Sequence, residues 1–282
     1  MTQVSLQGWS FHGSELIPNG RGVSGFFQEL SGWWEPSPST GEVEQRAYAS
    51  GGVPGRAFHQ SRVLVFKGGF RGDDPVAVRE EFEAFVGALP IDGLFPLVVE
   101  EGGLVRHVMA RLEGDPLVSW RGGKTATLNL QFVAPMWRRL AGDGSNPSRS
   151  VTVGLPFTQG GRRRPYVLPS RIDGVAVSGL VELVNMGSAP PPVVVEFVGP
   201  VSRPSVRSEV TGRSQWFDLE VLAGQSLVVD QDARSVRLNG VSRRGAMRGE
   251  WLAPVPGDRL VFDAGSFVEA ARMTVSWSDS WK

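Results

Sequence analysis

One segment of the chain has the periodicity of an amphipathic helix. Apolar side chains recur there at spacings of four, three, one and three residues, at Val78, Phe82, Phe85, Val86 and Leu89. Such spacing places them on one helical face. Asp74 suits the N-cap and Pro75 the first helical position, whereas Pro90 cannot continue a helix. The pattern predicts one helix, with its apolar face against a sheet.

Apolar runs of strand length surround this predicted helix. They cover residues 61–67, 94–100, 104–112, 117–120 and 125–133. In the last run, apolar residues from Ala126 to Phe132 alternate with polar ones, as in a strand with one buried face. The glycine pairs at 102–103 and 122–123 predict hairpin turns. We therefore expect an α+β first domain, with one helix on a strongly bent antiparallel sheet.

The glycine-rich stretch 68–72 lies between a predicted strand and the predicted helix, where phosphate-binding loops occur. It lacks the Gly-Lys-Ser/Thr ending of such loops, and it is followed by Asp73 and Asp74, which repel phosphate. We interpret this stretch as a sharp connection from strand to helix.

The second half of the chain has a different pattern. Residues 141–150 contain no large apolar side chain and predict a linker. Beyond Val151 helical periodicity is absent, and short strand-like runs follow at 174–185, 193–198, 204–210, 215–222, 226–230, 235–238, 259–262 and 271–277. Their spacing favours a β-sandwich of jelly-roll or lectin type. We predict a mainly β chain with an N-terminal domain at 1–140, a linker at 141–150 and a C-terminal sandwich at 151–282.

The composition is that of a globular protein with balanced charge. Of 282 residues, 41% are hydrophobic and 21% are charged, with 29 basic and 29 acidic side chains. A net charge of zero gives no attraction to nucleic acid or to an anionic membrane, so we expect neither partner. No apolar run reaches the ~18 residues of a membrane span, and no secretory signal is visible. We expect a soluble protein made in a cytoplasm.

The sequence offers no recognisable catalytic or metal-binding arrangement. Cysteine is absent, which excludes disulfides, thiolate nucleophiles and Cys-based zinc sites. His12, His59 and His107 are scattered, and neither Gly-x-Ser-x-Gly nor His-Glu-x-x-His occurs. We expect neither an enzyme nor a cofactor. Paired carboxylates brought together by folding would still allow a cell-wall hydrolase, which is the weakest alternative.

Two features are candidates for contact with a partner. Trp33 and Trp34 are adjacent, so on a strand one of them faces outward, as an interface anchor or a platform for a sugar ring. Arg162, Arg163 and Arg164 form the strongest basic run. This run is either a solvated loop or a partner for a neighbour's carboxylates. These five residues are the candidate interface.

Other segments have simpler interpretations. Weak patterning at 36–41 and 49–55 predicts loops, which are common places for partner contacts. We interpret Trp216, Trp251 and Trp277 as core residues of the sandwich rather than as sugar-binding residues.

The order of several segments resembles the distal tail protein family of siphophages, over nearly the whole chain. In the first half the resembling parts are Glu44-Gln45-Arg46, the strand-like run 62–68, the predicted helix and the run from Thr125 to Trp137. In the second half the resembling parts are the segments 181–188, 194–200, 222–230 and 254–262. The first of them contains Asn185-Met186-Gly187-Ser188. The second ends in Gly199-Pro200 and is followed closely by Arg203-Pro204.

This resemblance implies a galectin-like fold for the C-terminal sandwich and a structural role at the tail tip of a virion assembled in the host cytoplasm. It implies a homo-hexameric ring, built by the N-terminal domains, that joins the tail tube protein to the distal hub or fibre proteins. Some relatives carry inserted carbohydrate-binding modules, for which the short spacing of strands here leaves no room. The alternative is a carbohydrate-binding protein with weak contacts to host cell-wall glycans, favoured by the lectin-like sandwich and nine tryptophans.

Overall fold

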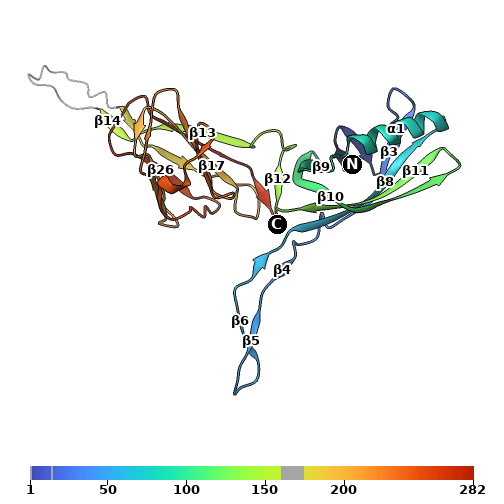
Figure 1. Cartoon of the computed structure of the whole chain (residues 1–282), viewed down its shortest axis with the longest axis horizontal. Helices are drawn as coiled ribbons and strands as arrows, with labels where there is room; N and C mark the ends of the chain where they lie inside the picture. Colours follow the sequence, from blue (N-terminus) through green and yellow to red (C-terminus); the bar gives the residue numbers. More distant parts are fainter. Residues whose placement is uncertain (1, 14, 160–174) are drawn as a thin grey trace, which may run out of the picture. The chain divides into compact units, whose positions relative to one another are not determined.

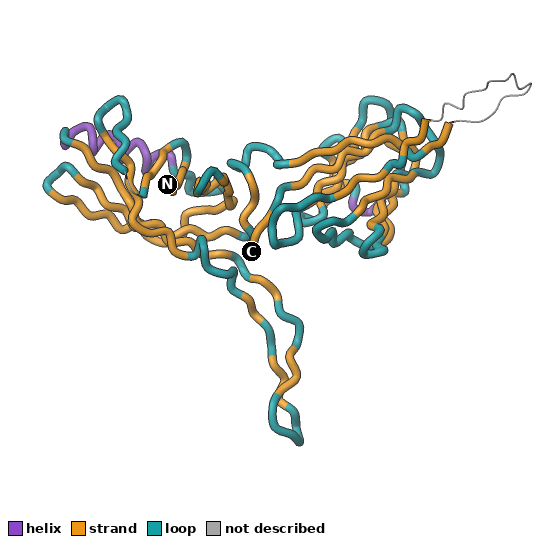
Figure 2. Tube along the Cα trace, turned by 180° about the vertical axis from the view of Figure 1, so that it is seen from behind, coloured by secondary structure: helices purple, strands orange, loops and turns teal. Residues whose placement is uncertain are grey.

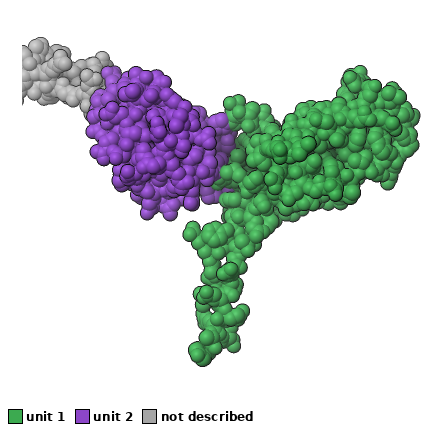
Figure 3. Space-filling view, viewed as in Figure 1, with its two compact units in different colours: residues 1–146, 281–282 green, residues 147–280 purple. Residues whose placement is uncertain are grey.

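The computed structural model describes residues 2–13, 15–159 and 175–282. The chain divides into two compact units (Figure 3). The first unit comprises Met1–Asn146 with Trp281–Lys282, and the second comprises Pro147–Ser280. Strands dominate both units (Figure 2), which confirms the prediction of a mainly β protein.

The first unit is a strongly curved sheet that closes on itself. Its strands follow one another in the order β11-β8-β3-β2-β1-β9-β10, and β10 pairs in turn with β11. Their bounds are β1 (Thr2–Leu6), β2 (Trp9–His12), β3 (Val23–Ser31), β8 (Arg62–Gly72), β9 (Phe95–Glu101), β10 (Leu104–Arg121) and β11 (Thr125–Ala134). Strand β12 (Arg139–Ala141) adds to β10. The pairs are antiparallel except for β2 with β3, which are parallel.

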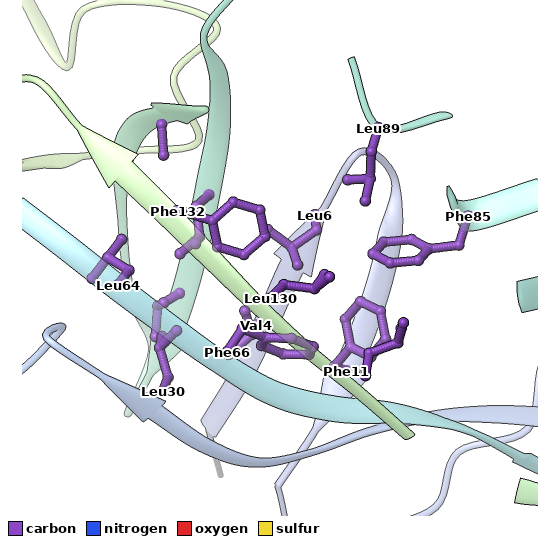
Figure 4. Packing of buried hydrophobic residues seen from close by; sticks show 14 of the residues in the cluster. Val4, Leu6, Phe11, Leu30, Leu64, Phe66, Phe85, Leu89, Leu130 and Phe132 are labelled. Carbon is purple, nitrogen blue, oxygen red and sulfur yellow. The ribbon is translucent and has the colours of Figure 1, made fainter. Parts of the chain in front are cut away.

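The predicted helix is present as α1 (Pro75–Ala88) (Figure 1). The side chain of Asp74 caps it by accepting a hydrogen bond of 2.9 Å from the backbone N–H of Val76. Phe85 lies on the buried face, and its ring packs 5.4 Å from that of Phe11 and 5.5 Å from that of Phe70. Figure 4 shows Phe85 pointing at Phe11 above the strands. The helix therefore covers the core enclosed by the curved sheet.

Strand β8 is longer than the sequence predicts. The prediction of a sharp connection at 68–72 is wrong, because the glycines lie inside β8, between β3 and β11. A Cβ on Gly69 would lie 1.9 Å from the carbonyl oxygen of Ala126, and one on Gly68 would lie 2.5 Å from that of Phe26. Glycine is required there because the neighbouring backbones come too close for a side chain.

The second unit is a β-sandwich, as the strand spacing predicts. One sheet has the order β13-β27-β17-β22-β23-β24 and the other has the order β16-β26-β19-β20-β25. Their bounds are β13 (Arg149–Gly154), β16 (Leu180–Glu182), β17 (Val193–Val198), β19 (Ser205–Ser208), β20 (Ser214–Phe217), β22 (Ser226–Asp230), β23 (Ser235–Leu238), β24 (Val241–Ser242), β25 (Met247–Gly249), β26 (Arg259–Asp263) and β27 (Arg272–Trp277). The aromatic ring of Phe197 packs 5.7 Å from Phe217 and 5.6 Å from Phe262, which joins the two sheets.

A buried pair of glutamines also connects the two sheets. Gln215 on β20 and Gln231, just after β22, exchange two amide hydrogen bonds of 2.9 Å each. The side-chain oxygen Oε1 of Gln231 accepts a third, from the backbone N–H of Leu252 at 3.2 Å. Gln215 is fully buried and Gln231 nearly so. Each amide therefore depends on the other for its hydrogen bonds, since water does not reach them.

We predict that the two glutamines are energetically coupled. Gln215→Leu leaves the amide of Gln231 buried without its partner and lowers the free energy of unfolding by about 2 kcal/mol. The double variant Gln215→Leu/Gln231→Leu should lose less than the two single variants together. Urea unfolding followed by tryptophan fluorescence measures all three, with Gln45→Leu at an exposed position as the control. Strictly additive losses would contradict the coupling.

Candidate interface

The longest exposed segment of the first unit is a ribbon of residues 36–61, here called the arm. It leaves the sheet after β3 and returns at β8 (Figures 1 and 2). Strand β4 (Ser39–Thr40) pairs with β7 (Phe58–His59), and β5 (Val43–Gln45) pairs with β6 (Gly52–Pro54). The stretches 36–41 and 49–55, predicted as loops, therefore lie in one hairpin. It follows that the chain presents an extended ribbon where the sequence indicates only loops.

The arm has no core of its own. Every residue in it is exposed except Ser37 and Gly52. The exposed side chains include Val43, Val53 and Phe58, each more than half accessible. A two-stranded ribbon is at best marginally stable in water, and a cluster of exposed apolar side chains on it is typical of a binding surface. The arm is therefore the strongest candidate in the first unit for contact with another protein.

A buried arginine holds the base of the arm. Arg62, at the start of β8, is 1% exposed. Its guanidinium donates hydrogen bonds to the carbonyl oxygens of Gly32, Trp33 and Glu35, before the arm, and of Trp137, at distances of 2.5, 3.4, 2.8 and 3.1 Å. One side chain thus ties together the segments where the arm leaves and re-enters the sheet.

A second buried arginine supports the same turn. Arg139 donates to the carbonyl oxygen of Trp33 at 2.9 Å, and its guanidinium lies 5.8 Å from the centre of the Trp33 ring. It also donates to the backbone oxygen of Lys282. Burial lowers the pKa of Arg139 to about 10, and the nearby charges of Arg62 and Arg106 add to this effect. Because this pKa is still well above 7, Arg139 keeps its charge at neutral pH.

The structure separates the two adjacent tryptophans. They lie on a bend after β3 and not on a strand. Trp33 is 1% exposed and packs in the core, so it is not available to a partner. Trp34 is 46% exposed, and its indole N–H donates to the carboxylate of Glu101 at 3.2 Å. One of the pair thus faces outward, and Trp34 stays the candidate interface residue, next to the base of the arm.

The other residues singled out in the sequence differ in where they lie and in how exposed they are. Arg162, Arg163 and Arg164 lie outside the described residues. Trp277 is buried in the sandwich core. Trp216 is 40% exposed, so its interpretation as a core residue is wrong. It occupies an outward position of β20, between the buried Gln215 and Phe217.

The described residues form no recognisable metal site. No three His, Asp or Glu side chains there gather in a way that could hold a metal ion. The helices within the described ranges are all too short or too polar to span a bilayer. Burial lowers the pKa of His107, whose Nδ1 lies 2.8 Å from the carbonyl oxygen of Gly142, so that this ring is a packed and hydrogen-bonded part of β10.

Removal of the buried guanidinium should destabilise the first unit. Arg62→Ala leaves four carbonyl oxygens without this donor, and we expect the free energy of unfolding to fall by about 3 kcal/mol or more. The matched control is Arg111→Ala, which breaks only an exposed ion pair with Glu113 and should change stability by less than about 1 kcal/mol. Equal urea midpoints for the two variants would show that Arg62 does not hold the arm.

The fold of this chain, but not its sequence, matches known proteins. No family model matches the chain, and no curated protein matches it by sequence. Among solved structures, the Dit (gp 19.1) protein of SPP1, described as a paradigm of the hub adsorption apparatus in phages that infect Gram-positive bacteria, superposes with a TM-score of 0.63. The match covers 100% of both chains at 13% identity.

Two structures of the phage P2 baseplate in its activated conformation also match. The structure with Sr has a TM-score of 0.53 at 13% identity, covering 98% of this chain and 97% of the other. The structure with Ca has a TM-score of 0.50 at 12% identity, covering 100% of this chain and 98% of the other. At such low identity the likeness is one of fold. The resemblance to distal tail proteins is confirmed at that level, and the chain has the fold of a phage Dit or baseplate protein.

Proposed function

We propose that this protein is a structural, non-enzymatic subunit of a phage tail tip, and thus part of the virion. The observation that carries the proposal is the match to the SPP1 Dit protein over 100% of both chains. Both units of the chain take part in this match, so the likeness is not limited to a common β-sandwich. The proposed role is that of a hexameric ring between the tail tube and the distal hub or fibre proteins.

The surface of the first unit supports self-association. A cyclic ring needs two different patches on each subunit that fit one another. The arm offers one of them. The other is the free edge of β10 from Leu117 to Arg121, which within the described residues pairs only with β11. Leu117, Val118 and Trp120 are exposed along this edge. An unpaired edge of this kind can accept a strand from a neighbouring subunit.

The charge balance supports close packing of several copies. With 29 basic and 29 acidic residues the subunit carries no formal net charge. Identical subunits of large charge would repel one another in a ring, and here that repulsion is absent.

The proposal predicts an oligomer in solution. Size-exclusion chromatography with light scattering should give a mass about six times that of the monomer at high protein concentration, or in the presence of the tail tube protein. Negative-stain images should then show rings. A strict monomer at high concentration that also fails to bind the tube and hub proteins would contradict the proposed function.

The arm should be needed for assembly but not for folding. A variant with residues 42–56 replaced by an Asn-Gly turn keeps the base at Arg62 and removes most of the exposed ribbon. We expect it to remain monomeric with an unchanged melting temperature, because the deleted residues contribute to no core. Light scattering and thermal unfolding measure both properties.

Two point variants refine this test. Trp34→Ala, beside the arm, should weaken assembly about tenfold, as expected for an exposed aromatic anchor. Met186→Ala, at an exposed apolar position of the second unit, should leave assembly unchanged. Normal rings from the arm-deleted variant would exclude the arm as a subunit contact.

A further inference from the structure

The second unit has a groove on the outer face of its five-stranded sheet. The groove has a volume of about 450 Å³, within the usual range for small-ligand sites. It lies over the three central strands, β26, β19 and β20. Strand register aligns two rows of outward side chains across these strands: first Asp263, Ser205 and Trp216, then Val261, Arg207 and Ser214. Strands are about 4.8 Å apart, and residues two apart on a strand are about 7 Å apart, so these rows match the size of a sugar ring.

Trp216 forms one wall of this groove. It is 40% exposed, which is unusual for such a large apolar side chain on a central strand. Gly249 on β25 lies beside the ring: a Cβ there would lie 2.3 Å from the carbonyl oxygen of Ser214 and 3.0 Å from Cζ3 of Trp216. The residue at 249 also has a φ of +89°, which favours glycine. The backbone of β25 therefore approaches the indole closely at this glycine.

Several polar side chains of the groove have hydrogen-bonding groups that are not used among the described residues. Within the described part of the chain, Ser205, Arg207 and Trp216 make no side-chain hydrogen bond. Ser205 can donate and accept, Arg207 donates in a plane, and the indole N–H donates. One carboxylate oxygen of Asp263 accepts from the backbone N–H of Ala264 at 2.8 Å, which leaves the second oxygen for a ligand. The groove therefore combines an aromatic surface with hydroxyl, carboxylate and guanidinium groups.

The groove favours an uncharged ligand over a peptide or an ion. Its strands lie inside the sheet and their backbone groups are paired on both sides, so a peptide cannot add as a further strand. Arg207 opposes a cationic ligand, and Asp263 opposes an anionic one such as a phosphate. A ligand that presents C–H groups to an indole and hydroxyl groups to Ser, Asp and Arg satisfies all of these features.

We infer that this groove binds a neutral saccharide, whose ring packs on Trp216 and whose hydroxyl groups hydrogen-bond to Ser205, Arg207 and Asp263. This activity goes beyond the proposed structural role and does not depend on it, because all the residues belong to the second unit. The protein would then contact a glycan directly, as well as contributing to an assembly.

Saturation-transfer NMR on the full chain tests the inference. The probes are maltose, lactose, cellobiose and N,N′-diacetylchitobiose at millimolar concentration, with glycerol phosphate as an anionic comparison. We expect saturation of ring protons for at least one disaccharide and none for glycerol phosphate. Trp216→Ala should weaken the affinity about tenfold or more, and Arg207→Ala should weaken it less. Thermal unfolding shows whether each variant is folded.

The matched control is Met186→Ala, which removes an exposed apolar side chain of the second unit outside the groove. It should leave saccharide binding unchanged. No transfer to any of the four disaccharides would overturn the inference, as would equal affinity in wild type and Trp216→Ala. Binding of glycerol phosphate alone would show an anion site instead. Ring formation is measured separately, by light scattering. A failure of saccharide binding is therefore distinguishable from a failure of the proposed structural role.

Discussion

The hydrogen bonds of Arg62 fix the geometry of the first unit's exposed surface. A guanidinium offers its N–H donors in one plane, and Nη1 and Nη2 of Arg62 donate to four carbonyl oxygens from two separate segments. Removing this charge from water is unfavourable, and burial accordingly lowers the pKa of Arg62. The arrangement persists because those carbonyls would otherwise be buried without donors. The arm is therefore held at both ends to a rigid sheet, and beyond its base, where His59 stacks on Trp137, nearly all its residues are exposed.

The orientation of the two tryptophans follows from the same turn. Gly32 has a φ of +80°, and a Cβ there would lie 2.0 Å from the carbonyl oxygen of Val63. The chain can turn so closely against β8 only because this residue is glycine. The turn directs Trp33 inward beneath the arginines, and Trp34 outward. A surface tryptophan and an exposed ribbon thus emerge side by side from a single buried cluster.

Elements with strong local signals were predictable from the sequence. The helix has its cap, its apolar face and its terminating proline within one segment, and the runs 193–198, 226–230 and 235–238 coincide with β17, β22 and β23. The arm could not be predicted as a ribbon, because a ribbon without a core has no alternation of buried and exposed positions. The hairpin of β10 and β11 was predicted from the glycine pair at 122–123, but closure of the first sheet was not, since it also depends on the non-local pairing of β11 with β8.

The candidate sites were only partly predictable, for related reasons. Adjacency indicated that one of Trp33 and Trp34 is exposed, but which one depends on the turn at Gly32. Arg62 gave no signal, because an arginine at the start of an apolar run resembles an ordinary solvated strand end. The interpretation of Trp216 as a core residue was wrong because it relied on residue type, and tryptophan is in general buried more often than glutamine.

At β20 the usual preference for burying tryptophan rather than glutamine is reversed, because two glutamines pair in the core. Gln215 is buried because Gln231 supplies its partner from the other sheet, and period-two alternation then forces Trp216 outward. The same constraint that satisfies a polar group in the core therefore creates an apolar platform on the surface.

The arm and this platform differ in what can cover them. An apolar ribbon with no core needs the broad surface of another protein to cover it. A groove on paired central strands can instead bind a small polar ligand through side-chain contacts alone.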